Sequence, residues 1–190
     1  MGRAWEAELA KQYKGMNALD VAATAWRIVR PAGPMERYQQ IMRAALIDEY
    51  CTAEIPPMDG AVDLVRRLRG LCPMAVASGS PLEAIERAME RLAIRDCFDV
   101  IVSSESVARG KPAPDVFLKA AEMLGARPQG CLVVEDSLSG VRAALAAGMK
   151  VFSVPSVVPE EISRLATGVY RSLAEVTREG VAGALGIGER

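Results

Sequence analysis

Residues 74–83, MAVASGSPLE, decide the fold class of this chain. The apolar run 74–77 is long enough for a short buried strand, and two serines and a glycine follow it at once. Ser80, Pro81 and Glu83 are the residue types preferred at a helix N-cap, at its first position and in a capping box. A strand that passes through a tight turn into a helix is the building unit of parallel α/β sheets.

The same alternation of apolar strands and helices continues towards the C-terminal end. We expect further strands at 100–102, 132–134, 151–154 and 169–170. We expect helices at 61–69, 81–92, 114–124 and 138–147, and a last one near the end. Strands that are apolar on both faces are typical of a parallel sheet covered by helices on both sides. The sequence therefore predicts an α/β, Rossmann-like fold, in which ligands bind beyond the carboxyl ends of the strands.

The first part of the chain has only helical patterns. We expect helices at 3–14, 18–29 and 35–50, and Pro56 with Pro57 ends the last of them. The sequence thus divides into a helical segment, 1–56, and an α/β core, 57–190.

Composition excludes several classes of function. The chain has 190 residues, 51% hydrophobic and 25% charged, with a net charge of -1, which is ordinary for a globular protein. No basic cluster suggests a nucleic-acid partner, and no apolar run is long enough to cross a membrane. The N-terminus is charged from the start and has no apolar core, so we expect a cytoplasmic protein.

Histidine is absent, and the four cysteines are isolated: Cys51, Cys72, Cys97 and Cys131. This excludes zinc sites that need histidine, Ser-His-Asp triads and Cys-His dyads. Each cysteine is expected to be a small apolar residue in a reducing compartment. Chemistry must come from Asp, Glu, Lys, Ser or a metal.

Polar residues follow the expected strands at three places. Ser78 and Gly79 precede a helix N-terminus, where free N–H groups favour an anion, although serines there can simply cap the helix. Lys111 lies in a loop stiffened by two prolines, where an ammonium group suits phosphate. Glu135 and Asp136 follow the strand 132–134.

The two carboxylates suit Mg²⁺, which prefers oxygen ligands. Alternatively, Asp136 or Ser137 caps the helix that follows. A hydroxyl, an ammonium and a carboxylate pair at strand ends of one sheet predict a pocket for an anion and a metal.

Residues 57–155 resemble the core of haloacid-dehalogenase-like hydrolases, in the branch of β-phosphoglucomutase and small sugar-phosphate phosphatases. The segments ASGS (77–80), GKPAPD (110–115) and VEDSLSG (134–140) resemble the second, third and fourth motifs of that family, in the same order. The resemblance implies that Ser78 and Gly79 bind the transferring phosphoryl group and that Lys111 neutralises phosphate and nucleophile. It implies that Glu135 and Asp136 bind Mg²⁺, and that the segment before Pro57 is part of a helical cap.

One family motif has no counterpart here. Members carry Asp-x-Asp at the end of the first strand, the first Asp as nucleophile and the second as general acid/base. This chain has no such triplet, and its first aspartate, Asp20, falls in an expected cap helix. We therefore expect the first strand and part of the cap to be missing. That strand would be central, so its absence would leave unpaired the inner edges of the strands ending at Ala77 and Val134.

The resemblance implies a Mg²⁺-dependent phosphatase of a small phosphorylated metabolite, such as a sugar phosphate, acting through an aspartyl-phosphate. One alternative is a phosphomutase like β-phosphoglucomutase. Another is a non-catalytic fragment or a phospho-ligand-binding module that uses Ser78 and Lys111.

Overall fold

The computed structural model describes residues 33–52, 56–155 and 160–188. The helices expected at 3–14 and 18–29 lie outside the described residues. The helix expected at 35–50 is confirmed as α3, Met35–Thr52.

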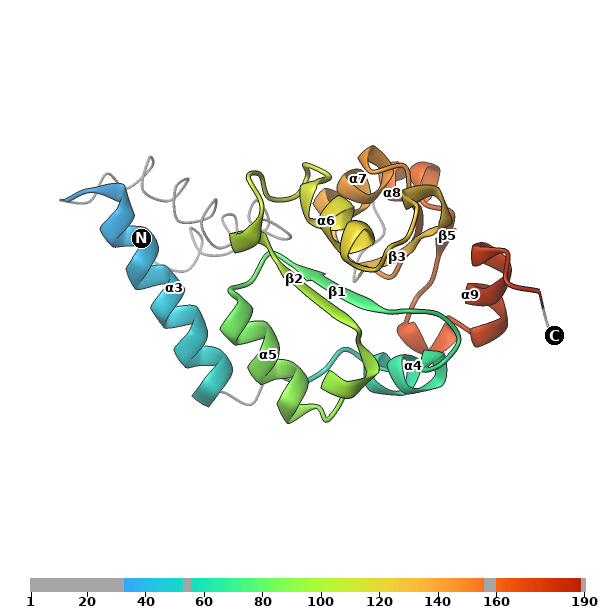
Figure 1. The fold of residues 1–190 in the computed structure, drawn as a ribbon, viewed down its shortest axis with the longest axis horizontal. Helices are drawn as coiled ribbons and strands as arrows, with labels where there is room; N and C mark the ends of the chain where they lie inside the picture. Colours follow the sequence, from blue (N-terminus) through green and yellow to red (C-terminus); the bar gives the residue numbers. More distant parts are fainter. Residues whose placement is uncertain (1–32, 53–55, 156–159, 189–190) are drawn as a thin grey trace.

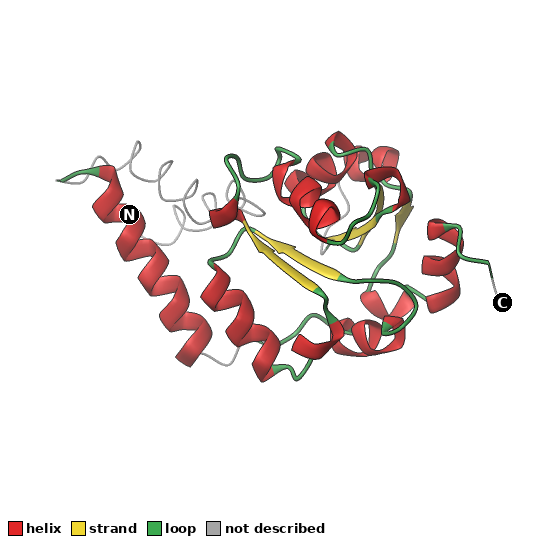
Figure 2. Ribbon diagram, in the orientation of Figure 1, coloured by secondary structure: helices red, strands yellow, loops and turns green. Residues whose placement is uncertain are grey.

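The alternation of helices and strands after residue 57 is confirmed, with each end within two residues of its expected place (Figures 1 and 2). In chain order the elements are α4 Ala61–Leu68, β1 Ala75–Ser78, α5 Leu82–Arg91, β2 Val100–Ser103, α6 Asp115–Met123, β3 Leu132–Glu135, α7 Leu138–Ala146, β4 Lys150–Ser153, α8 Glu160–Leu165, β5 Gly168–Val169 and α9 Arg178–Leu185. Helix α8 and several short 3-10 turns were not expected from the sequence.

All strand pairs are parallel, but they form two sheets instead of one. β1 pairs with β2, with Ala75 opposite Val100, while β3, β4 and β5 form the second sheet, with Val133 opposite Val151. Helix α5 lies on one side of the β1–β2 pair and α6 on the other (Figure 1). The prediction of a parallel α/β fold with flanking helices is confirmed.

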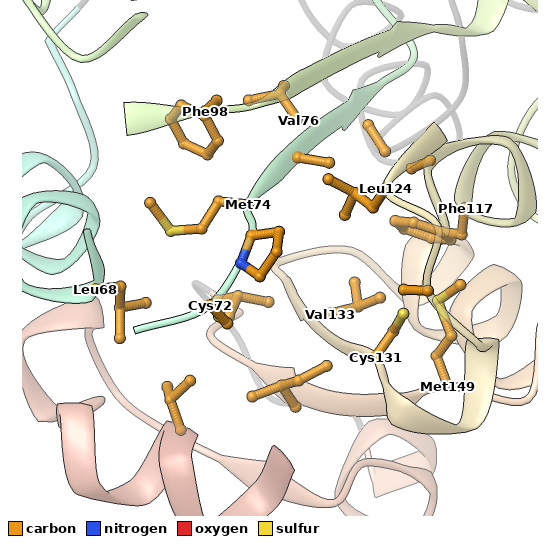
Figure 3. A pocket seen from close by; sticks show the side chains of 18 of the residues that line it. Leu68, Cys72, Met74, Val76, Phe98, Phe117, Leu124, Cys131, Val133 and Met149 are labelled. Carbon is orange, nitrogen blue, oxygen red and sulfur yellow. The ribbon is translucent and has the colours of Figure 1, made fainter. Parts of the chain in front are cut away.

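The inner edges of the two sheets, β1 and β3, are separated by an apolar cavity of about 530 Å³. Side chains from both strands and from α4, α6 and α9 line it (Figure 3). The sequence predicts that both strands are buried. In the structure, however, every residue of β1 is only half-buried, and Val134 of β3 is 38% exposed. The described residues place no strand between β1 and β3.

The main hydrophobic core lies between strands β2 and β4 and the helices that pack on them. Val102, Val116, Val141, Val151 and Ile162 are at most 1% exposed and belong to one cluster that spans β2, β4, α6, α7 and α8. Each such side chain stabilises the fold by about 1.5–3 kcal/mol. This cluster therefore packs β2 and β4 against the helices that cover them.

Helix α3 packs against α5 of the core, and Arg43 of α3 pairs with Glu105. The boundary between a cap and a core at residues 56–57 stays a prediction. Among the described helices, none is both long and apolar enough to cross a bilayer.

Candidate functional site

The carboxylate of Glu135, at the end of β3, has partners on both oxygens. Its Oε2 accepts hydrogen bonds from the backbone N–H groups of Asp136 and Ser137, both at 3.0 Å, and from the Ser137 hydroxyl at 2.9 Å. Its Oε1 forms an ion pair with Nζ of Lys111. The side chains of Lys111 and Glu135 are 10% and 8% exposed, so this pair is almost fully withdrawn from water.

The start of α7 is shaped around this carboxylate. Ser137 caps the helix by accepting a hydrogen bond from Gly140 N–H at 3.1 Å, so the N-cap alternative is settled for Ser137. A Cβ on Gly140 would lie 2.0 Å from Cδ of Glu135. Gly140 therefore provides the space that the carboxylate occupies.

Burial alone would raise the pKa of the Glu135 carboxyl. The charge of Lys111 and the hydrogen bonds from Lys111 and Ser137 outweigh burial, and the pKa lies below its usual value. Glu135 is therefore ionised at neutral pH and holds the Lys111 ammonium at the carboxyl end of β3.

The loop before α6 fixes the position of Lys111. Arg109 donates two hydrogen bonds to Asp115, at 3.2 and 2.9 Å, which tie the two ends of the loop together. The turn inside is closed by the bond from Ala113 N–H to the Gly110 carbonyl, at 2.9 Å. Nζ of Lys111 also lies 4.7 Å from the centre of the Phe117 ring, a favourable position for a cation.

At the end of β1, Ser80 N–H donates a hydrogen bond to the Ser78 hydroxyl oxygen at 3.1 Å. The expected capping box is wrong, because α5 begins at Leu82 and its N-cap is Pro81, which has no side-chain donor or acceptor. The Leu82 N–H donates instead to the carboxylate of Glu105, at 3.2 Å. The carboxylate of Glu105, 23 residues further along the chain, therefore takes the place of a capping side chain at the start of α5.

The structure brings together some of the expected site residues. Lys111, Glu135 and Asp136 meet at the end of β3, while Ser78 and Gly79 belong to the other sheet. Within the described residues, no hydrogen bond or ion pair joins Ser78 or Gly79 to Lys111. Lys111 and Glu135 line the cavity between the sheets, and the neighbour of Ser78 in β1, Ala77, lines it from the other side.

The residues at the end of β3 are compatible with Mg²⁺. In the described part of the chain, no group of three or more carboxylate or cysteine side chains could hold a metal. Proteins commonly hold Mg²⁺ through one or two carboxylates, with phosphate oxygens and water completing an octahedron. Asp136, adjacent to Glu135 and half-buried, meets that requirement.

Sequence reasoning missed the polar residues after β2. Ser103 donates to the Ser80 carbonyl and Ser104 to the Gly79 carbonyl, at 2.7 and 2.9 Å. The sequence did contain a pattern that could have identified them, because the apolar run 100–102 is followed directly by Ser-Ser-Glu. The rule that polar residues at strand ends form sites applies to this strand as well.

The parallel strands, flanking helices and polar strand ends place the chain among Rossmann-like proteins of the α/β class. A family model for haloacid dehalogenase-like hydrolases matches residues 7–148, and the chain belongs to that family.

Relatives support the assignment. The chain is 32% identical over 171 residues to hexitol phosphatase B of Escherichia coli K12, a match that covers 87% of this chain and 76% of that protein. It is 44% identical over 126 residues to the bifunctional riboflavin kinase/FMN phosphatase of Arabidopsis thaliana, covering 65% of this chain but only 31% of that protein. The crystal structure of CbbY from Rhodobacter sphaeroides in complex with phosphate has a TM-score of 0.77 and 26% identity, covering 91% of this chain and 79% of that one.

Proposed function

We propose that this chain is the main part of a Mg²⁺-dependent phosphohydrolase that acts on a small phosphomonoester such as a sugar phosphate. The observation that carries the proposal is the buried Lys111–Glu135 ion pair beside Asp136, at the carboxyl end of a parallel strand. Hexitol phosphatase B, by its name, acts on a phosphorylated sugar alcohol, which supports a substrate of this class.

The phosphoryl group would be held by groups from both sheets. The Ser78 hydroxyl accepts from Ser80 N–H, and its own proton can be donated to a phosphate oxygen. Gly79 lets the backbone approach the phosphate closely. Lys111 would offset the negative charge on the phosphoryl oxygens from the opposite side.

Asp136, with Glu135 beside it, would hold Mg²⁺. When bound, the ion would neutralise charge on the phosphoryl group. The Glu135 carboxylate faces Lys111 as well as the end of β3. Glu135 then also keeps Lys111 in place.

We place the nucleophile on a strand that fills the cavity between β1 and β3. The cavity is apolar, as a central strand requires, and Lys111 lies where the carboxyl end of such a strand would emerge. An aspartate there would attack phosphorus while the ester oxygen leaves with a proton from a second carboxylic acid. Water then hydrolyses the aspartyl-phosphate. Because these 190 residues contain no Asp-x-Asp, the proposal requires this strand to be supplied from outside them.

A phospho-ligand-binding module is the second candidate. The binding groups Ser78 and Lys111 are present without an Asp-x-Asp triplet, which favours binding without turnover.

The test is hydrolysis of p-nitrophenyl phosphate and of a hexitol phosphate, with and without Mg²⁺, by the chain extended with the sequence encoded upstream of Met1. The proposal predicts turnover that needs Mg²⁺ and falls at least about 100-fold in Lys111→Met and Asp136→Asn. The matched controls are Lys119→Met and Asp96→Asn, which alter exposed surface ion pairs. Phosphate binding with no turnover of any phosphomonoester would favour the binding module.

A further inference from the structure

We infer that Ser103 and Ser104, which follow one another at the end of β2, are positioning residues for the turn formed by residues 78–80. Their hydroxyls hold this turn in the conformation that presents the Ser78 hydroxyl to an anion. The inference rests on the proposed role of Ser78 and Gly79 in binding phosphate.

Both serines are placed for this role by the sheet. Parallel pairing sets Ser78 of β1 opposite Ser103 of β2, so the residues after each strand lie side by side. The Ser103 hydroxyl donates to the Ser80 carbonyl at 2.7 Å, and the Ser104 hydroxyl donates to the Gly79 carbonyl at 2.9 Å. The two serines are only 4% and 8% exposed, so water does not readily replace either bond.

The bond from Ser104 acts on Ser78 through one peptide plane. The Gly79 carbonyl and the Ser80 N–H belong to the same planar unit, so holding the carbonyl also fixes the direction of the N–H. That N–H donates to the Ser78 hydroxyl oxygen at 3.1 Å. The Ser78 oxygen is thereby used as an acceptor, and its proton is directed to another partner.

The bond from Ser103 fixes the next peptide. It holds the carbonyl of Ser80, whose peptide partner Pro81 has no N–H to anchor it. The Ser103 oxygen is itself fixed, because it accepts the N–H of Glu105 at 3.1 Å. The carbonyls of Gly79 and Ser80 are therefore engaged by Ser104 and Ser103, and neither presents its oxygen to a bound phosphate, which it would repel.

The test is the affinity of the chain for inorganic phosphate, measured by titration calorimetry. We expect Ser104→Ala to weaken binding about fivefold and the Ser103→Ala, Ser104→Ala double variant more than tenfold. Ser104→Thr keeps the hydroxyl and is expected to restore binding. Ser106→Ala is the matched control, since its hydroxyl donates to the Ser103 carbonyl and does not contact the turn; it should leave the affinity unchanged. Equal affinities of wild type and double variant would overturn the inference.

Amide hydrogen exchange of residues 79–82 separates this inference from the proposed function. The double variant is expected to exchange faster there, and Ser106→Ala is not. If the wild type binds no phosphate, the proposed role of Ser78 and Gly79 fails for this chain, and exchange alone decides whether the serines hold the turn. Unchanged exchange in the double variant would contradict the inference whether or not phosphate binds.

Discussion

Lys111 and Glu135 form an ion pair in which the two side chains are 10% and 8% exposed. Removing one partner of a buried pair leaves the other charge without compensation. We expect Glu135→Gln to lower the free energy of unfolding by about 3 kcal/mol, measured by urea denaturation at pH 7. Glu122→Gln, which alters a pair on the surface of α6, should cost less than about 0.5 kcal/mol.

The Lys111→Met, Glu135→Gln double variant should lose less stability than the sum of the two single variants, because it leaves no unpaired buried charge. Losses that simply add would show that the two groups do not interact.

Gly140 leaves the space that the Glu135 carboxylate occupies. Gly140→Ala places a methyl group 2.0 Å from Cδ of Glu135, so the carboxylate or the helix must move. We expect the free energy of unfolding to fall by about 1–3 kcal/mol, measured by urea denaturation. Gly183→Ala is the control, because nothing lies within 4 Å of the added methyl group in α9; alanine there should stabilise the protein by about 0.5 kcal/mol. A neutral Gly140→Ala variant would contradict this geometry.

Glu105 gives a pH-dependent contribution to stability. Burial would raise the pKa of its carboxyl, but the hydrogen bonds from Arg43 and Leu82 and the charge of Arg43 hold the pKa below its ordinary value of 4.5. Because the folded-state pKa is depressed, this stabilisation is present above pH 4.5 and is lost as the pH falls through the folded-state value.

We therefore expect Glu105→Gln to cost about 1 kcal/mol at pH 7 and progressively less below the ordinary pKa. The measurement is thermal unfolding of both proteins from neutral to acid pH. Glu86→Gln, an exposed change on α5, is the control. A stability difference that does not change with pH would contradict the role of the ionised carboxylate.

Cys72 and Cys131 line the cavity between β1 and β3, whereas Cys97 is only 8% exposed. Burial raises the pKa of both Cys72 and Cys131, so alkylation is faster at alkaline pH. We expect iodoacetamide, followed by peptide mass mapping, to modify Cys72 and Cys131 faster than Cys97. In a chain extended by the strand that fills the cavity, both cysteines should be protected at least about tenfold. Unchanged labelling on extension would mean that nothing enters the cavity.

Most of the fold could be predicted because local signals and tertiary packing agree. The polar turn 78–80 ends the first strand, and Gly125 and Gly148 follow α6 and α7 with φ of +64° and +76°, as helix ends require. The expected capping box of α5 was wrong because the Leu82 N–H donates to Glu105, which lies in the 3-10 turn after β2. A partner so distant in sequence leaves no local signal.

Part of the arrangement of the candidate site could be predicted, although the roles of its residues stay predictions. Glu135 and Asp136 stand at the end of β3, Lys111 lies in the loop before α6, and Ser137 follows capping rules. The separation of Ser78 from Lys111 by the cavity depends on how the two sheets pack. Composition and the periodicity of apolar residues do not predict how two sheets pack against each other.

The most direct test of the proposed function compares the 190-residue chain with the same chain extended by the sequence encoded upstream of Met1. Both are assayed with p-nitrophenyl phosphate and Mg²⁺. We expect turnover only by the extended chain, and its loss when an aspartate at the end of the added strand is changed to asparagine. Robust turnover by the 190-residue chain, abolished in Asp136→Asn, would mean that a carboxylate within these residues is the nucleophile and would contradict the proposed strand between β1 and β3.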